Sequence, residues 1–341
     1  MRASGYLKKA GGRARPRWGG ALIAAACLAG VLAGGAPAQA ATPQPGTAAA
    51  AQAGHAGAAI APGILAAEKT ASSKARATHA KVVVDVETTE TSQVTANPDG
   101  TFTLTESSTP VRVLKGGAWV PVSTALGWEA NGTVAPAATA TGVVFSGGGS
   151  RAMATLAQGS DQLSFTFPEP LPRPTLSGDT AIYSDVLPSV DLRLTADATG
   201  FSEILVIKDR AAAASPALAK LTLGLRAQGV QVKSLPDGTA EAVSSSGKSV
   251  FHSDQALMWD STGTPAPGDS TPATSTPATS GSRALVTAAA AGGPGAGAHR
   301  ARVGVVTSGT SESLAPDQTL LTASDTTYPV YEDPTWSGNR S

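Results

Sequence analysis

The chain has 341 residues, with 25 Lys and Arg against 25 Asp and Glu, and an aromatic fraction of 4%. This neutral balance, without a basic patch, excludes proteins that hold nucleic acid or an anionic membrane surface by charge. The single cysteine, Cys27, excludes a disulfide framework and a cysteine metal site. An ordinary apolar core must therefore stabilise the chain, which is long enough to build one from Val, Leu and Ile.

The first 40 residues have the three parts of a secretory signal peptide. Six cations and no acid precede residue 18, a short apolar run covers residues 21–36, and Ala38-Gln39-Ala40 supplies a small-x-small cleavage site. The apolar run is shorter than the roughly 20 residues of a membrane span. We predict export and cleavage after Ala40, giving a secreted chain with 19 cations against 25 acids and no membrane span. A retained anchor and lipidation at Cys27 are the alternatives.

Residues 41–80 are rich in Ala, Gly, Pro and Gln and show no apolar stripe at helical spacing. Alanine favours helix, but a helix without such a stripe has nothing to dock against. We expect a disordered leader, with at most a transient helix near residues 64–75.

Residues 81–260 change to short strand-like runs separated by turn residues. Residues 97–100 (NPDG) give a strong turn signal, and residues 101–106 alternate Thr with Phe and Leu. Residues 201–208 carry a continuous apolar run, which is typical of a strand covered on both faces. Many short strands with few helices predict an all-β fold, an antiparallel β-sandwich.

Residues 261–300 break this pattern with a Ser/Thr/Pro tract and an Ala/Gly tract. Such tracts bury too little apolar surface to offset the entropy of ordering, so we expect an extended linker suited to O-linked sugars. Residues 301–341 are expected to return to the sandwich as strands, at residues 302–307, 319–322 and 328–331.

Residues 183–208 (YSDVLPSVDLRLTADATGFSEILVIK) resemble a segment near the start of large exported actinobacterial proteins, which continue into LamG-like jelly-roll, DNRLRE-type or RHS-repeat domains. The motif residues, with a closing Met-Trp-Asp, are Tyr183, Asp185, Pro188, Asp191, Phe201, Glu203, Trp259 and Asp260. The resemblance implies an all-β N-terminal module of a larger protein, with these residues in structural roles. In that family an aliphatic residue usually stands at the position of Glu332, and a charge there is expected to weaken docking of the last strand.

Nucleophilic catalysis needs a base held beside a hydroxyl or thiol. Three of the four histidines lie in low-complexity segments that are not expected to position a base: His55, His79 and His299. His252, with Asp254 two residues later, is then the one candidate for a triad base. The alternative is a surface histidine at the end of a strand.

Glycoside hydrolysis needs two carboxylates in a cleft, and the best candidates are Asp185, Asp191 and Glu203. Glu203 shares a strand face with Phe201 and is expected to point inward, paired with Arg193 across the strand or with backbone amides. A Ca²⁺ ion held by Asp185 and Asp191 is an alternative.

Three classes of function stay open. The favoured one is a secreted, non-catalytic module with a scaffolding or interaction role at the cell surface, whose partner is a glycan or a protein. The second is a carbohydrate-binding module, with Trp119 and Trp259 as glycan contacts. The third is a glycoside hydrolase. We expect no cofactor and no metal, and the sequence does not identify the ligand or the oligomeric state.

Overall fold

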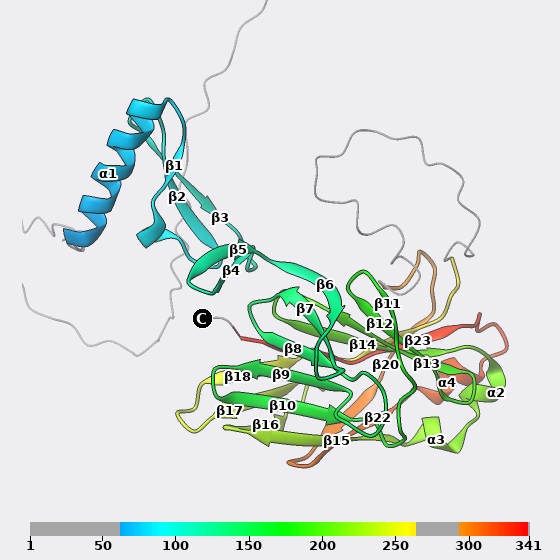
Figure 1. The fold of residues 1–341 in the computed structure, drawn as a ribbon. Coiled ribbons are helices and arrows are strands. Elements are labelled where there is room, and N and C mark those ends of the chain that lie inside the picture. Colours follow the sequence, from blue (N-terminus) through cyan, green and yellow to red (C-terminus); the bar gives the residue numbers. More distant parts are fainter. Residues whose placement is uncertain (1–61, 264–292, 340–341) are drawn as a thin grey trace, which may run out of the picture. The chain divides into compact units, whose positions relative to one another are not determined.

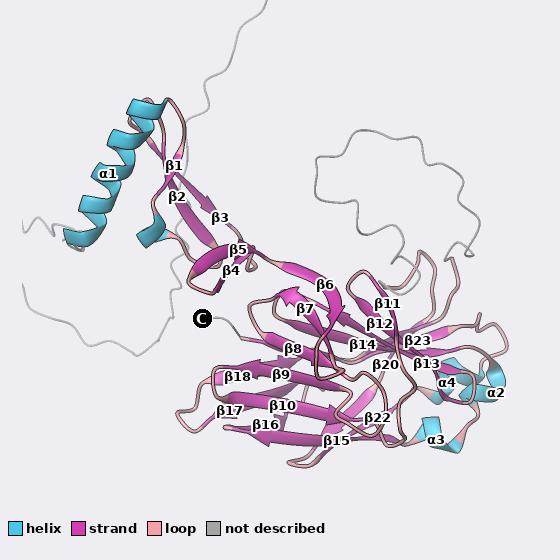
Figure 2. Ribbon diagram, viewed as in Figure 1, coloured by secondary structure: helices cyan, strands magenta, loops and turns pink. Residues whose placement is uncertain are grey.

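The computed structural model of the chain describes residues 62–263 and 293–339 (Figure 1). The predicted signal peptide, residues 41–61 of the predicted leader and residues 264–292 of the predicted linker lie outside these described residues. Strands dominate the described residues and form antiparallel sheets (Figure 2). The predicted all-β, antiparallel β-sandwich is confirmed.

One layer of the sandwich is an eight-stranded sheet. Its strands, from edge to edge, are β21 (Gly304–Thr307), β22 (Ser311–Ala315), β15 (Leu221–Gln228), β10 (Asp161–Thr166), β9 (Ala154–Gln158), β8 (Gly142–Phe145), β7 (Val134–Ala138) and β6 (Ser123–Trp128). Consecutive hairpins join β6 to β10, whereas β15 and β22 come from far downstream in the chain.

The other layer is an eleven-stranded sheet. Its main path is β11 (Thr175–Ser177), β12 (Thr180–Leu187), β13 (Val190–Ala196), β14 (Gly200–Ile207), β24 (Thr335–Gly338), β18 (Ser249–Ser253), β17 (Ala240–Ser244) and β16 (Val230–Ser234). Three more strands join off this path: β19 (Leu257–Trp259), β20 (Arg300–Arg302) and β23 (Val330–Asp333). The sheet therefore combines strands from both sides of residues 264–292.

Strand β14 shows how the sequence pattern becomes packing. Phe201, Leu205 and Ile207 face the main core, while Ile204 and Val206 pack on the opposite face in a second cluster. This arrangement is the one that the continuous apolar run predicts for a strand covered on both faces.

Four aromatic rings join the two layers. Phe145 and Phe165 belong to the eight-stranded sheet, and both rings meet Phe201 of β14 edge-on, at centroid distances of 5.8 and 5.9 Å. The ring of Trp336 on β24 lies 5.6 Å from that of Phe165. Such edge-to-face contacts add to the free energy of apolar burial, and they place the centre of the core at β14 and β24.

The segment before the sandwich holds a helix that the sequence did not predict to be stable. Helix α1 (Pro62–Thr78) packs Ala71 and Ala75 against Val84 and Ala96. It precedes β1 (Val82–Val83), η1 (Asp85–Glu87), β2 (Ser92–Ala96), β3 (Phe102–Glu106), β4 (Arg112–Lys115) and β5 (Ala118–Pro121). The predicted disordered leader is wrong for residues 62–78, because alanines four residues apart form a narrow docking stripe.

The C-terminal residues differ from the prediction at three elements, because β22 and β24 lie outside the predicted ranges and one predicted strand is a helix. Residues 319–322 were expected to form a strand, but they belong to the helix α4 (Gln318–Thr322). Asp317 caps this helix, since its Oδ1 accepts a hydrogen bond of 2.7 Å from Leu320 N. The two other short helices are α2 (Arg210–Ala213) and α3 (Pro216–Ala219).

Candidate functional site

The motif from Tyr183 to Asp191 holds a β-bulge. The register of β12 on β13 shifts between Tyr183 and Leu187, and Asp185 lies in the left-handed region at φ 52°. Asp191 Oδ1 accepts a hydrogen bond of 2.8 Å from Asp185 N. Lys208 Nζ lies 2.8 Å from Asp185 Oδ1 and 2.6 Å from Asp191 Oδ1. The ammonium lies between the carboxylates, and this arrangement fits an ion pair better than a Ca²⁺ ion.

Other residues of the same motif are parts of the fold. Tyr183 is fully buried, and its hydroxyl donates a hydrogen bond of 2.6 Å to the carbonyl of Ser146. Burial raises the pKa of that hydroxyl above its usual range. Pro188 begins the two-residue turn between β12 and β13, in which Ser189 takes a φ of 57°. These residues fix the hairpin and its contact with the opposite sheet.

Glu203 points into the sandwich, as its alternation with Phe201 predicts, and is only 2% exposed. The predicted pairing with Arg193 is wrong. In the register of β13 on β14, Leu194 lies opposite Glu203, and Arg193 lies opposite Ile204. Arg193 therefore faces the other side of the sheet, because successive side chains alternate between faces. Within the described residues, Glu203 Oε1 is buried without a hydrogen-bond partner.

Two further glutamates are buried near Glu203. Glu312 lies on β22 of the eight-stranded sheet, and Glu332 lies on β23, opposite Leu205 and Met258 in the two adjoining registers. Trp336 Nε1 donates a hydrogen bond of 3.0 Å to Glu312 Oε2. In the described part of the chain, Glu312 Oε1 and both carboxyl oxygens of Glu332 have no partner. We refer to Glu203, Glu312 and Glu332 as the core glutamates.

Burial shifts the ionisation of the core glutamates towards their neutral forms. It raises the pKa of Glu312 to about 7 and that of Glu332 to about 8. It also raises the pKa of Glu203 well above its usual value, with a further contribution from the carboxyls of Glu312 and Glu332. Acids with such pKa values can serve as proton donors, but a glycosidase needs them in a cleft open to the sugar. These acids face the buried interior of the sandwich.

Sequence reasoning found one of the core glutamates and misjudged another. Glu312 was missed because residues 311–315 (SESLA) carry too few apolar positions to predict a strand. We expected a charge on Glu332 to weaken the docking of the last strand. That charge is largely absent at pH 7, because the pKa of Glu332 is raised to about 8 and the side chain is mostly neutral. Strand β23 pairs on both sides, with β14 and with β19.

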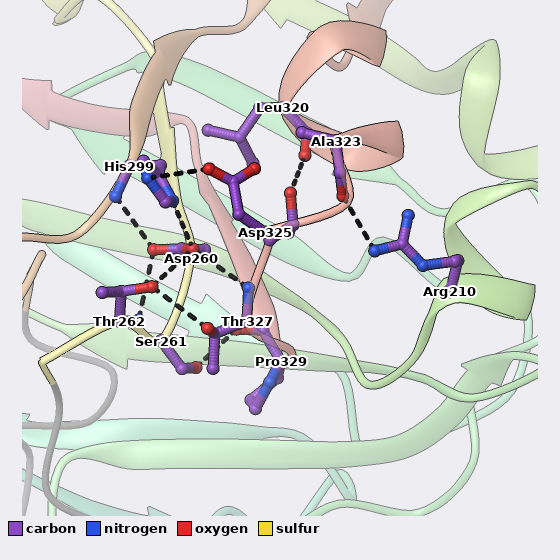
Figure 3. A network of polar contacts seen from close by, with 11 residues as sticks. Arg210, Asp260, Ser261, Thr262, His299, Leu320, Ala323, Asp325, Thr327 and Pro329 are labelled. Atoms are coloured by element: carbon purple, nitrogen blue, oxygen red, sulfur yellow. Dashed lines mark hydrogen bonds and ion pairs between the residues drawn. The ribbon is translucent and has the colours of Figure 1, made fainter.

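The second group of buried polar residues surrounds Asp260, which follows β19 (Figure 3). Its Oδ1 accepts from the backbone N–H groups of His299 and Thr262, at 2.9 and 3.2 Å. Its Oδ2 accepts from Thr262 Oγ1 at 2.8 Å and from Thr327 N at 3.1 Å, and lies 2.9 Å from His299 Nδ1. Although burial opposes the charge, these hydrogen bonds together lower the pKa of Asp260 to about 2.

Asp260 joins the two ends of the segment that the structure does not describe between residues 264 and 292. Its own N–H donates to His299 O at 3.1 Å, and the neighbouring strands β19 and β20 pair Trp259 with Arg300. The conclusion that His299 cannot be positioned was wrong. The hydrogen bond to the Asp260 carboxylate raises the pKa of His299, and Asp325 Oδ2, 3.7 Å from Nε2, adds to this effect.

An aspartate that orients an imidazole is the supporting half of a catalytic triad, and Asp260 and His299 have this geometry. His299 lines a pocket of about 390 Å³ together with Arg300, Thr319 and Asp325. The charged group that faces His299 Nε2 among the described residues is the carboxylate of Asp325, at 3.7 Å (Figure 3). A carboxylate favours the protonated imidazolium, which cannot act as a base. The arrangement suits a structural role better than that of a catalytic base. We refer to Asp260 with its partners Thr262, His299 and Thr327 as the Asp260 clasp.

The predicted catalytic candidate, His252, does not form a triad with Asp254. His252 Nδ1 is buried and, within the described residues, has no hydrogen-bond partner. In the sheet it lies opposite Glu241 on one side and Ser337 on the other. The structure therefore brings no aspartate to its ring.

The two predicted glycan contacts have different positions. Trp259 is 3% exposed and stacks on Tyr331, with ring centroids 5.8 Å apart and an interplanar angle of 25°, so it cannot serve as a surface platform. Trp119 is half-buried on β5, opposite Leu114. The ring of the exposed Trp128 is covered by the guanidinium of Arg173, whose Cζ lies 4.1 Å from the ring centroid.

Comparison with protein families, with curated proteins and with solved structures finds no match for this chain. Over residues 62–263 and 293–339, no three His, Cys, Asp or Glu side chains converge in a way that could hold a metal ion. Among the helices of these same residues, none combines the length and the apolar character needed to cross a bilayer.

Proposed function

We propose that this chain is an exported, non-catalytic β-sandwich module with a scaffolding or interaction role at the cell surface, and that it forms the N-terminal part of a larger protein. Export is supported by the signal-peptide pattern of residues 1–40. The place in a larger protein is supported by the resemblance of residues 183–208 to the front modules of multi-domain surface proteins.

The observation that carries the interaction role is the distribution of exposed apolar side chains. Seven of the ten large apolar side chains that the structure leaves exposed lie between residues 62 and 121: Leu65, Val83, Val86, Phe102, Leu104, Val111 and Leu114. Exposed apolar patches mark interaction surfaces, whereas single scattered side chains do not, so this concentration in one segment supports an interaction surface within residues 62–121. The sandwich, which is larger, has only Trp128, Leu257 and Val306.

The same structure offers less support for a hydrolase. The acids with raised pKa values are closed into the sandwich core, and the oriented imidazole of His299 faces a carboxylate. A carbohydrate-binding module is also less supported, because of its two predicted contacts Trp259 is buried and Trp119 is half-buried.

Retention of the purified full chain on isolated actinobacterial cell walls tests the interaction role. We expect retention to fall at least several-fold for Val86→Ser with Leu114→Ser. The matched control is Val306→Ser with Leu257→Ser, which removes one valine and one leucine that are exposed on the sandwich and should leave retention unchanged. Equal retention of all three proteins, or release of reducing sugar from the walls by the wild type, would overturn the proposal.

Export has its own test. The chain is expressed in an actinobacterial host, and the mass of the protein in the culture medium is measured. We expect the mass of a chain whose first residue is Ala41. A chain that stays with the cells and retains residues 1–40 would contradict export.

A further inference from the structure

Strand β3 forms an open edge beside a partly covered apolar groove. It is the last strand of the sheet β1-β2-β3 and pairs only with β2 in the described part of the chain. Phe102 and Leu104 lie opposite Ala96 and Val94, so they share the sheet face on which α1 packs. Even so, they are 42% and 57% exposed. Helix α1 therefore covers β1 and β2 and leaves the edge strand bare.

The hydrogen bonds just before and just after β3, both to the β2 side, show which of its backbone groups face outward. Asn97 N donates to Thr101 O, and Ser107 N donates to Thr91 O, both at 2.8 Å. Hydrogen-bonded pairs alternate along an antiparallel ladder, so the odd-numbered residues of β3 bond to β2. The N–H and C=O groups of the even-numbered residues, Phe102, Leu104 and Glu106, point away from β2. An edge of this kind is a template for another strand.

We propose that β3 of a second copy of this chain pairs antiparallel with β3, about a two-fold axis at Leu104. This inference rests on the proposed interaction role and names the partner. In that register Leu104 faces Leu104 of the second copy, and Phe102 faces Glu106 of the second copy. All three residues have outward-pointing backbone groups, so the pairing forms about six hydrogen bonds. The result is a continuous six-stranded sheet with both α1 helices on the same face.

Charge complementarity favours a second copy over an unrelated strand. The groove of about 400 Å³ between α1 and β3 is lined by Leu65 and Phe102 together with Glu68, Lys69 and Arg76, so cations outnumber acids among its charged side chains. Glu106 lies at the opposite end of the same strand and on the same face. The two-fold axis brings Glu106 of each copy beside Lys69 and Arg76 of the other.

The side chains of β3 are also self-complementary. Leu104 of one copy lies directly opposite Leu104 of the other, and Phe102 of each copy is a diagonal neighbour of Leu104 of the other. Aromatic and aliphatic side chains interact over both of these distances. The opposite face of the strand carries Thr103 and Thr105, which face each other in the same register and suit solvent. Pairing therefore buries the exposed apolar side chains and keeps the threonines outside.

The size of the core beneath α1 gives an independent reason for association. Its buried members are only Ala71, Ala75, Val84 and Ala96. A three-stranded sheet with so little buried apolar surface is marginal. Doubling the sheet and covering Phe102 and Leu104 enlarges the core at the place where it is incomplete.

Sedimentation equilibrium of the full chain, over about 1 to 200 μM, tests this proposal. We expect a monomer–dimer equilibrium for the wild type and a monomer throughout for Leu104→Pro. Proline at this position removes an outward-pointing N–H and leaves the β2 ladder intact. Thr103→Val, on the solvent face, is the matched control and should keep the dimer. A wild type that stays monomeric, or a dimer that survives Leu104→Pro, overturns the proposal.

A charge exchange tests the register. We expect Glu106→Lys alone to weaken dimerisation at least tenfold, because the new ammonium lies beside Lys69 of the other copy. Combining Glu106→Lys with Lys69→Glu in one chain should restore the wild-type dissociation constant. Failure of the double variant to recover dimerisation overturns the two-fold register.

A spin label locates the axis. Leu104→Cys is labelled in a chain that also carries Cys27→Ser, since Cys27 is the only other cysteine. Residues paired at the axis have Cα atoms about 5.5 Å apart, so strong exchange broadening is expected. Dimers without broadening contradict the axis. Cell-wall retention and dimerisation are measured separately on the same proteins. A wild type that is monomeric but binds cell walls overturns the β3 dimer and leaves the proposed function standing.

Discussion

The sandwich and the α1–β3 part (residues 62–106) differ in how they bury apolar surface. The sandwich core contains large side chains from both sheets, including Phe145, Phe165, Phe201 and Trp336. The core of the α1–β3 part contains three alanines and one valine. Buried apolar area sets most of the favourable free energy of folding. The sandwich therefore gains much more of this free energy from its own core than the α1–β3 part does, and the α1–β3 part is where binding has the most to add.

The largest effect is expected from a break in the centre of the sandwich. Trp336→Ala removes a buried ring that contacts Phe165 and leaves Glu312 Oε2 without its donor. We expect the free energy of unfolding to fall by roughly 3–5 kcal/mol, measured by urea denaturation. Trp128→Ala is the control, because this ring is 41% exposed. Equal losses for the two variants would contradict the position of the core at β24.

The core glutamates distinguish the sandwich from the α1–β3 part, because they make the stability of the sandwich depend on pH. The pKa of Glu332 is about 8 in the folded chain, above the ordinary value near 4.5. The unfolded chain then loses its proton first as pH rises. Stability is therefore highest below about pH 4.5 and falls until pH reaches the folded pKa.

Glu332→Gln should remove the part of this slope that belongs to Glu332. The amide keeps the shape of the neutral acid and cannot ionise. We expect the variant to be more stable than the wild type by roughly 4 kcal/mol at pH 8 and by only about 1 kcal/mol at pH 5. Urea denaturation at both pH values measures the difference. Glu129→Gln, an exposed position, is the control; an unchanged slope in Glu332→Gln would show that Glu332 is ionised in the folded chain.

The Asp260 clasp should respond to pH in the opposite direction. The pKa of Asp260 is lowered to about 2, so its contribution is present above the unfolded pKa near 3.8 and is lost as pH falls towards 2. Asp260→Asn places an amide NH₂ among donors and should cost roughly 2 kcal/mol at pH 6. Urea unfolding at pH 6 and pH 3 should show a smaller acid loss in the variant. An equal acid loss in both proteins would mean that the clasp is not formed.

Much of the sandwich could be predicted from the sequence because its signals are local. In the sandwich, β14 is covered on both faces, as its continuous apolar run predicts. Outside the sandwich, in the α1–β3 part, the predicted turn at residues 97–100 is formed, with Gly100 at φ 87°. The inward direction of Glu203 follows from alternation along one strand. These features depend on neighbours within a few residues.

The features that were missed depend on contacts between distant parts of the chain. Glu203 and Glu312 are more than a hundred residues apart, and no local pattern shows that their strands face each other. Asp260 and His299 are joined across residues 264–292, so composition around His299 indicated only low complexity. Likewise, the alanine stripe of α1 is too weak to identify until the strands beneath it are known.

The smallest effect is expected in the α1–β3 part, and it tests whether this part is as marginal as its core indicates. Ala75 is fully buried in the last turn of α1. Ala75→Gly should cost about 1 kcal/mol through helix propensity, which is small for the sandwich but large for a core of four residues. We expect faster amide hydrogen exchange over residues 62–106, with exchange in β13 and β14 unchanged. If the exposed Ser73→Gly speeds exchange equally, intrinsic propensity alone is at work; a larger effect at Ala75 shows that its contact with the sheet holds the helix in place.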